Sequence, residues 1–243
     1  MSEPYKIVIT EDLSPSLETL NSSNISETMH SRRGAFSETL FIYGKNISQL
    51  IEHKLSPKIL SVGLGLGYNE VLATGMYLAH APDKLDELYI ESYESEAPLR
   101  GSFCEWLNGS KETKFYDIYT QILNLTASHL DINPNELMNS LTSLFKNRKI
   151  EIKEALDLET VFSSKFTSIL FDAYSAKMSP KLWSEELLNK VLSASDEDCI
   201  LSTYAAKGGL TRALKQAGFT VSLDKGFKGK RNHTHAIKKK SLV

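Results

Sequence analysis

The sequence has few of the features that mark secreted or membrane-spanning chains. Only two of its 243 residues are cysteines, Cys104 and Cys199, and they share no metal-binding or redox spacing. The first residues show no basic flank followed by an apolar stretch, and no apolar run approaches the roughly 20 residues of a membrane span. We therefore expect a soluble cytoplasmic domain with no membrane association and no metal.

The motifs of several enzyme classes are missing as well. The sequence contains no G-x-S-x-G, no G-K-[ST] and no H-E-x-x-H. It therefore lacks the motifs that usually indicate the matching hydrolases, NTPases and zinc proteases. His233 and His235 are spaced to share one face of a strand, but no third metal ligand accompanies them. Internal repeats are absent, and 41% hydrophobic and 24% charged residues indicate one ordinary globular domain.

Basic residues gather near the C-terminal end of an otherwise balanced sequence. The formal net charge is −2, yet the last nineteen residues hold seven of the 28 lysines and arginines. Such a segment is most often a solvated end, and this feature alone favours that interpretation. The alternative is a surface that contacts phosphates, since each cation on a phosphate releases counterions and adds affinity. The residues concerned are Lys225, Lys228, Lys230, Arg231, Lys238, Lys239 and Lys240.

From residue 58 onward, apolar strand patterns alternate with helical ones. This alternation predicts an α/β fold, a Rossmann-like and mostly parallel sheet with helices on both faces. No helix pattern separates the strands expected at 219–224 and 234–239, so we predict an antiparallel edge at the C-terminal end. Residues 1–57 are predicted to be a small β-rich extension, including a strand over 37–44, and residues 101–149 a helical insertion. The whole chain, 1–243, is interpreted as a single domain with 58–243 as its core.

Glycines recur at the corner where the first core strand meets a helix. Gly63, Gly65 and Gly67 occupy alternate positions there. Glycines at such a corner permit a tight turn and let a ligand approach the backbone, next to the free N–H groups of a helix N-terminus. The spacing G-x-G-x-G departs from the dinucleotide fingerprint and is typical of methyltransferases. A plain strand–helix corner is the alternative.

Two further strands end in carboxylates. Glu94 stands at the tip of the second core strand, where it can accept the hydroxyls of a ribose; Glu91 alternates with the apolar face and fits less well. Asp172 ends a continuous apolar strand, and with Tyr174 and Trp183 it can hold an amine beside a flat ring. A surface acid is the alternative for either glutamate, and a helix cap is the alternative for Asp172.

Taken together, these motifs resemble the methyltransferase domain of the MnmC type, the tRNA (5-methylaminomethyl-2-thiouridine)-forming methyltransferases. The resemblance runs from about Thr10 to the end. It departs from the family pattern at Leu13, where a glycine is usual, at Ser61 in place of an acid, at Ala176 in place of a proline, and at Glu154, where an aspartate that reads adenine is expected. The motifs that carry it are ETMHSRRGAFSETLFI, ILSVGLGLGYN, YESEAPL, DAYSAKMSPKLW, STYAAKGGLTRALKQAGF and KGFKGKR.

The resemblance implies a class I methyltransferase that uses S-adenosyl-L-methionine and methylates the aminomethyl group of a modified wobble uridine in the tRNA anticodon loop. It implies that Asp172 is catalytic because it orients the amine. It also implies a stand-alone methyltransferase domain, with a separate enzyme supplying the aminomethyl precursor. Three alternatives stay open, namely an aminopropyltransferase, a small-molecule amine methyltransferase and a non-catalytic nucleotide-binding module. The implied cofactor residues are Gly63, Leu64, Gly65, Gly67, Asn69, Glu94, Glu154 and Asp172, and the implied substrate residues are His30, Arg33, Glu38, Tyr174, Trp183, Lys228, Lys230 and Arg231.

Overall fold

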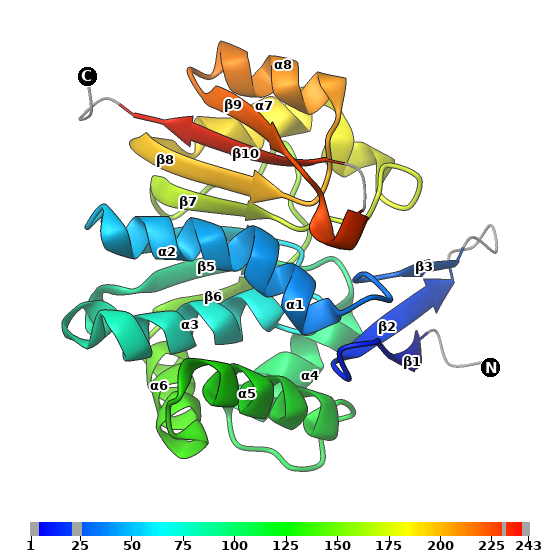
Figure 1. Cartoon of the computed structure of the whole chain (residues 1–243), viewed down its shortest axis with the longest axis vertical. Helices are drawn as coiled ribbons and strands as arrows, with labels where there is room; N and C mark the ends of the chain where they lie inside the picture. The colour runs from blue at the N-terminus through cyan, green and yellow to red at the C-terminus, as the bar shows by residue number, and fades with distance from the viewer. Residues whose placement is uncertain (1–4, 21–25, 230–231, 240–243) are drawn as a thin grey trace.

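The computed structural model of the chain describes residues 5–20, 26–229 and 232–239, and a seven-stranded sheet forms its centre (Figure 1). The strand order is β6-β5-β4-β7-β8-β10-β9, in which the first five strands run parallel and β10 is antiparallel to both of its neighbours. The predicted Rossmann-like α/β fold with an antiparallel C-terminal edge is confirmed. The strands are β4 (Lys58–Val62), β5 (Tyr89–Tyr93), β6 (Ile150–Lys153), β7 (Phe166–Phe171), β8 (Ser195–Thr203), β9 (Thr220–Asp224) and β10 (His233–Lys238).

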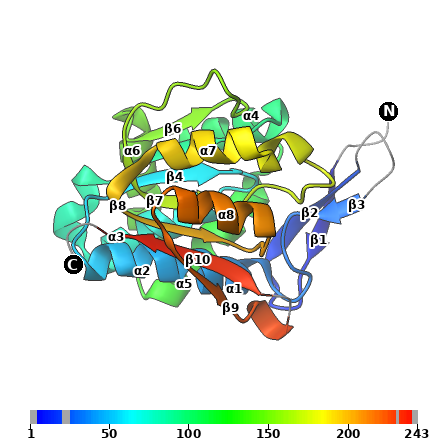
Figure 2. The ribbon, with the colours of Figure 1, turned by 90° about the horizontal axis from the view of Figure 1, so that it is seen from above.

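Helices cover both faces of this sheet because the core strands are apolar on both sides. In β4, Ile59 packs into a core with the helices of one face, whereas Leu60 packs into a second core with the helices of the other. Figure 2 shows α7 (Glu185–Ser193) and α8 (Gly208–Gln216) together on one side. The opposite face carries α2 (Lys45–Glu52) and α3 (Tyr68–His80), with α4 (Ala97–Leu107), α5 (Tyr116–Leu130) and α6 (Pro134–Lys146) further along the same core.

The predicted strand over 37–44 is wrong, because this segment is helical. Helix α1 (Ala35–Thr39), the π-helical turn η1 (Leu40–Gly44) and α2 follow one another without a break. The apolar residues of 37–44 alone resemble a strand, but the buried positions continue at Ile47 and Leu50, in step with one face of a helix. The N-terminal β structure of the described residues therefore ends before residue 35, and α2 packs against β7 and β8.

Side chains that precede α1 satisfy its first backbone N–H groups. The Asp12 carboxylate accepts hydrogen bonds from the backbone N–H and the hydroxyl of Ser37, at 2.9 and 2.6 Å. The Ser14 hydroxyl accepts from the N–H groups of Ala35 and Phe36, at 3.0 and 2.9 Å. Between these two residues Leu13 has a φ of +65°, in the left-handed region.

The other N-terminal strands form a small antiparallel sheet, β1 (Tyr5–Ile9), β2 (Pro15–Leu20) and β3 (Ser26–Thr28), in that order. This sheet lies at the carboxyl end of the parallel strands, on the right in Figure 1. Polar contacts attach it there. The Tyr5 hydroxyl donates to Glu96 at 3.0 Å, the Tyr68 hydroxyl donates to the Pro15 carbonyl at 2.7 Å, and Glu27 accepts from the Ser175 backbone N–H at 2.9 Å.

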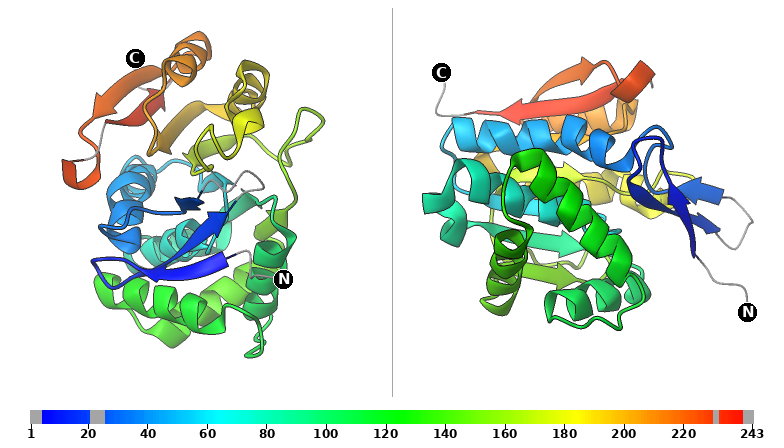
Figure 3. Two further views of the ribbon diagram at one scale, coloured as in Figure 1. Left: turned by 90° about the vertical axis from the view of Figure 1, so that its right-hand side faces the viewer. Right: turned by 60° about the horizontal axis from the view of Figure 1, so that its bottom comes forward.

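The stretch predicted as a helical insertion contains α5, α6 and most of α4, which stack below α3 in Figure 1 and come forward in the right panel of Figure 3. Pro134 opens α6, and the side chain of Asn133 caps it by accepting from the Asn135 N–H at 2.8 Å. Within the described ranges, no helix has the length and apolar character that a membrane crossing requires.

Candidate functional site

A cavity of about 410 Å³ lies at the carboxyl ends of β4, β5 and β7. Open α/β sheets bind ligands at this edge. The left panel of Figure 3 looks at this end of the molecule and shows the small sheet in front of it. The cavity is lined by Glu27, Met29, His30, Val62, Gly63, Leu64, Gly65, Tyr68, Asn69, Tyr93, Glu94, Ser95, Ala155, Leu156, Asp172, Ala173, Tyr174, Met178, Ser179, Pro180, Lys181, Leu182 and Tyr204.

The glycine turn forms the floor of this cavity. Gly63 has a φ of +98°, and a Cβ there would lie 2.5 Å from the Asp172 carbonyl oxygen, so the turn packs against the end of β7 only because Gly63 has no side chain. Gly67 has a φ of +75° and precedes α3, and a Cβ there would collide with the Phe103 ring. Gly63 and Gly65 line the cavity, whereas Gly67 lies outside its lining and lets the helix start against α4.

Glu94 presents its carboxylate to the cavity from the end of β5. Its two oxygens accept hydrogen bonds from the backbone N–H groups of Gly65 and Glu96, each at 2.9 Å. Burial raises the pKa of Glu94 above its ordinary value. Each carboxylate oxygen has capacity for a further donor, so Glu94 can accept the hydroxyls of a ligand that lies over the turn.

Glu91, three residues earlier, serves the sheet and lies outside the cavity lining. Its carboxylate is buried and accepts from the Tyr93 hydroxyl at 2.7 Å and from the Lys153 ammonium at 3.1 Å. Burial alone would raise the pKa of Glu91, but the hydrogen bonds from Tyr93, Ser163 and Lys153 outweigh it and lower the pKa. The preference for Glu94 over Glu91 therefore agrees with where the two side chains lie.

Asp172 is the acid at the centre of the site. One of its oxygens accepts from the Tyr43 hydroxyl at 2.7 Å, and the other accepts from the Asn69 amide at 3.2 Å. Burial raises the pKa of Asp172 to about 7, against the opposing effect of the Tyr43 hydrogen bond. Its carboxyl group can therefore hold or release a proton near neutral pH, in a fixed orientation.

A second cavity of about 150 Å³ adjoins the first and shares Asp172 with it. Glu38, a predicted substrate residue, lines this smaller cavity, where its carboxylate accepts from the Ser31 N–H at 2.6 Å. His30 lines both cavities, with Nδ1 at 3.0 Å from the Ser16 hydroxyl. The smaller cavity thus gathers carboxylates and hydroxyls around Asp172, an environment that suits a cationic or proton-donating group.

The aromatic residues that follow Asp172 have different positions. Tyr174 lines the larger cavity. Trp183 does not line it, but its indole N–H donates to the Tyr174 carbonyl at 2.7 Å and its ring packs edge-on against Phe171, with centroids 5.1 Å apart. Trp183 therefore holds the segment that carries Tyr174 instead of facing the ligand space.

The structure does not bring every predicted residue to the cavity. The Glu154 side chain is 86% exposed and lies 3.6 Å from the Arg100 guanidinium, although the next two residues of the chain line the cavity. Arg33 and Lys228 lie outside the lining and bond to each other, because the Lys228 ammonium donates to the Arg33 carbonyl at 2.9 Å and Arg33 donates to the Lys228 carbonyl. Lys230 and Arg231 lie outside the described residues.

The sequence did not identify several residues of the site, among them Tyr43, Glu27 and Tyr204. The strand predicted over 37–44 gives no reason to direct the Tyr43 hydroxyl towards Asp172. Glu27 and Tyr204 come from segments distant in sequence, and they line both cavities. The only signal for Glu27 was its place at the start of the ETMHSRRGAFSETLFI motif.

A buried carboxylate also lies beneath the glycine turn, where the family resemblance places an acid at position 61. Ser61 is buried and pairs with Ser92 across β4 and β5. The Ser92 hydroxyl donates at 2.7 Å to Glu70 of α3, and burial raises the pKa of Glu70 to about 6. The buried acid in this layer therefore comes from the helix and not from the strand.

Fold and site together define a Rossmann-like protein with a ligand cavity that lies over a glycine turn and is lined by the carboxylates of Glu27, Glu94 and Asp172. A family model described as S-adenosyl-L-methionine-dependent methyltransferase matches residues 111–239, more than half of the chain. The chain belongs to this family, and the predicted cofactor, S-adenosyl-L-methionine, agrees with it. The matched residues begin after the glycine turn and Glu94, so the family assignment does not depend on either of these features.

Two curated relatives are similar to almost the whole chain. The chain is 24% identical over 234 residues to the tRNA 5-methylaminomethyl-2-thiouridine biosynthesis bifunctional protein MnmC of Burkholderia thailandensis, and 25% identical over 244 residues to that of Burkholderia pseudomallei. Each match covers 94% of this chain and 34% of the relative, so the chain spans about a third of their length. The predicted resemblance to the MnmC type is confirmed.

A solved structure shares the fold. The crystal structure of MNMC2 from Aquifex aeolicus matches with a TM-score of 0.64 and 23% identity, over 97% of this chain and 71% of that one.

Proposed function

We propose that this chain transfers a methyl group from S-adenosyl-L-methionine to the aminomethyl group of a modified wobble uridine in tRNA. The observation that carries the proposal is the partly buried Asp172 carboxyl, which faces both cavities, is fixed by Tyr43 and Asn69, and has its pKa raised to about 7 by desolvation. We take tRNA as the substrate class from the names of the MnmC relatives.

The residues of the larger cavity fit the cofactor. Gly63 and Gly65 leave the backbone open over the turn, and Glu94 has acceptor capacity for ribose hydroxyls. The apolar side chains of Leu64, Tyr93 and Leu156 are available to flank a flat base. Glu154 lies outside this lining, so we assign it no cofactor contact.

The cofactor, when bound, supplies a methyl carbon that its sulfonium makes electrophilic. Asp172 then accepts a hydrogen bond from the substrate amine, so that the nitrogen lone pair points at that carbon. Transfer of that methyl group to the amine would leave the methyl–sulfur electron pair on sulfur and would release one proton from nitrogen. The proton lost from nitrogen passes to the Asp172 carboxylate, whose pKa of about 7 lets it release the proton to water afterwards.

The substrate side of the site consists of Tyr174, His30 and the acidic smaller cavity with Glu38. A base of an anticodon loop can be splayed out and held against aromatic side chains, which we assign to Tyr174. A separate enzyme supplies the aminomethyl precursor in this proposal, and the compartment is the cytoplasm.

Nucleoside mass spectrometry tests the reaction directly. The protein is incubated with S-adenosyl-L-methionine and tRNA that carries aminomethyluridine, and the nucleosides are then analysed. We expect the methylaminomethyl nucleoside to appear only with both protein and cofactor. An aminopropyl product formed from decarboxylated cofactor would indicate an aminopropyltransferase, and cofactor binding without any product from tRNA or from small amines would indicate a non-catalytic module.

Calorimetry tests the cofactor contacts. Glu94→Ala removes the acceptor over the turn and should weaken cofactor binding about tenfold or more, given the strength of hydrogen bonds to charged groups. Glu154→Ala is the matched control, because that exposed side chain should leave affinity unchanged. Equal affinities of the Glu94 variant and the parent protein would remove Glu94 from the site.

A further inference from the structure

An exposed aromatic side chain lies on the same helical turn that serves Asp172. The turn η1 directs Tyr43 inward to Asp172, whereas Phe41, two residues earlier, is 44% exposed. Turns of π-helix are rare and occur frequently at functional sites. The turn that positions the proposed catalytic acid therefore also presents a flat apolar ring to solvent.

Two aromatic rings lie beside Phe41, and a cation lies over one of them. Its ring centroid lies 5.4 Å from His233 and 5.9 Å from Phe227, at interplanar angles of 67° and 51°, so neither neighbour stacks parallel on it. The Lys228 ammonium lies 5.3 Å from the centroid of Phe227. Lys228 and Arg33 are joined by their reciprocal hydrogen bonds. We call Phe41, Phe227, Arg33 and Lys228 the Phe41 platform.

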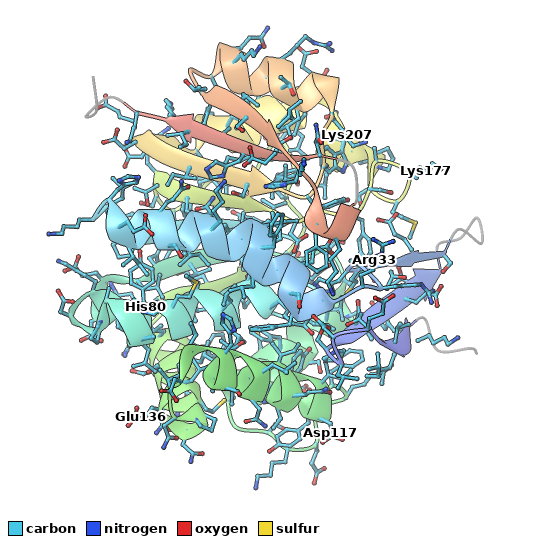
Figure 4. The ribbon with its side chains drawn as sticks, viewed as in Figure 1. Arg33, His80, Asp117, Glu136, Lys177 and Lys207 are labelled. Carbon is cyan, nitrogen blue, oxygen red and sulfur yellow. The ribbon has the colours of Figure 1, made fainter. Side chains whose placement is uncertain are left out.

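The platform is positively charged and close to the cavity. Arg33 and Lys228 supply two cations, and the nearby Asp224 is paired with Lys45 at 2.9 Å. Arg33 follows His30, which lines the cavity, by only three residues. Figure 4 shows Arg33 between the small sheet and the turn that carries Lys228, at the end of the sheet where the cavity lies.

We infer that the Phe41 platform is a docking surface for the RNA substrate, in which an unpaired base stacks on the Phe41 ring while Arg33 and Lys228 contact the flanking phosphates. This inference rests on the proposed function and adds to it a surface outside the cavity. An exposed ring near cations suits single-stranded and looped RNA, because every base has a face to stack and every linkage has a negative charge, and Phe41 is the exposed ring here whereas Phe227 is buried. A protein partner would instead need contiguous apolar area, which cations interrupt here.

The test compares two variants of Phe41, one that lacks the aromatic ring and one that keeps it. Phe41→Leu keeps an apolar side chain and loses the ring, and Phe41→Tyr keeps the ring. We measure the affinity of the full chain for tRNA by fluorescence anisotropy. The leucine variant should bind about 5- to 100-fold more weakly, the loss expected for one stacked base, and the tyrosine variant should stay within about twofold of the parent.

The cations are tested by the salt dependence of the same binding. Replacing Arg33 and Lys228 together with alanine should weaken binding and reduce the salt slope by about two, one for each lost phosphate contact. Lys146→Ala is the matched control, because Lys146 ends α6, away from the cavity (Figure 1), and should change neither quantity. Calorimetry with S-adenosyl-L-methionine should give the parent affinity for every variant, which shows that each is folded.

The outcomes separate this inference from the proposed function. If the parent methylates tRNA but Phe41→Leu binds it with parent affinity and the double variant keeps the parent salt slope, the platform is overturned and the function stands. If the parent neither binds nor methylates tRNA, the proposed function itself fails. If Phe41→Leu instead converts a dimer to a monomer in size-exclusion chromatography, the surface joins two copies of the chain and the RNA assignment is overturned.

Discussion

At the scale of single residues, Leu13 stands out because its backbone has a conformation that favours glycine. Its φ is +65°, and its side chain is 71% exposed, so little burial offsets the strain. For a residue with a side chain, this conformation destabilises the folded protein by about 1–2 kcal/mol. Glycine removes that strain, but its greater freedom in the unfolded chain costs about 0.5–1 kcal/mol. The family resemblance places a glycine at this position, and the structure gives the physical reason.

We therefore expect Leu13→Gly to stabilise the protein by about 0.5–1 kcal/mol, which corresponds to a rise of roughly 1–4 °C in Tm for a chain of this size. Differential scanning calorimetry measures it. Leu158→Gly is the control, because Leu158 is similarly exposed at 53% but is not among the residues with positive φ, so this change should lower Tm. A lower Tm for Leu13→Gly would show that the strain is absent.

Asp172 gives the second prediction at this scale, for the rate and its pH dependence. Because burial raises its pKa to about 7, the carboxylate that accepts the amine proton is the major form only above that pH. The methylation rate should fall as the pH decreases through about 7. Asp172→Asn should lose this acid limb together with most of the rate.

Asp172→Ala should reduce the rate about a hundredfold or more, since loss of an orienting group misplaces the amine, and should keep cofactor affinity within a few-fold. Single-turnover assays and calorimetry measure the two quantities separately. Partial activity in the asparagine variant would show that orientation matters more than charge. Parent rates in both variants would reduce Asp172 to a structural acid.

At the scale of elements, a prediction succeeds or fails according to how many residues a pattern must span before it can be recognised. The core strands were predictable because each is a short apolar run next to a turn, as with Phe166–Phe171. The helical segment from Ala35 to Glu52 was not, because the stretch 37–44 is rich in apolar and aromatic residues and its helical period appears only when Ile47 and Leu50 are included. That error hid Tyr43 from the predicted site.

A buried polar network joins α2 to the sheet and makes stability depend on pH. The Asn46 side chain bonds to Ser168 and Ser202, and the Ser202 hydroxyl contacts Nδ1 of His235 at 3.0 Å. Burial lowers the pKa of His235 to about 4, below the ordinary value of 6.5. The unfolded chain therefore takes up a proton first, and stability is lost as the pH falls from about 6.5 towards 4.

His235→Asn removes this titration. Between pH 7 and pH 5 the parent should lose about 2 kcal/mol more than the variant, as the two pKa values of His235 require. Urea unfolding at both pH values measures the difference, and the carboxylates common to both proteins cancel from it. Parallel pH profiles for parent and variant would show that His235 is not buried in its neutral form.

At the scale of the whole molecule, the carboxyl ends of β4, β5 and β7 meet at one edge, which the strand–helix alternation predicts. Gly63, Glu94 and Asp172 could be placed together for that reason. What sequence alone could not give is which distant side chains close around them. Glu27 bonds to Ser175 and Tyr43 bonds to Asp172 only because the small sheet and η1 fold back over the strand ends.

The network around Asn46 also has a consequence for how the chain acquires its fold during synthesis. Asn46 donates to the Ile200 carbonyl at 3.1 Å, across 154 residues, and Leu60 of the central strand faces Ile169 of β7. At roughly 5–20 residues per second, α2 emerges from a ribosome on the order of ten seconds before the strand that buries it. Until that strand has been made, the apolar face of α2 has no strand to pack against.

A fragment that ends at residue 160 lacks β7, β8 and β10, so it should lack cooperative unfolding and bind a dye specific for exposed apolar surface, such as ANS. Extension to residue 239 should restore both cooperativity and low dye binding. A cooperative melt of the shorter fragment would show that α2 finds its partners early. Otherwise β7 and β8 decide when the glycine turn and its acids first become a site, because Asp172 directly follows β7 and Tyr204 directly follows β8 in the lining of the cavity.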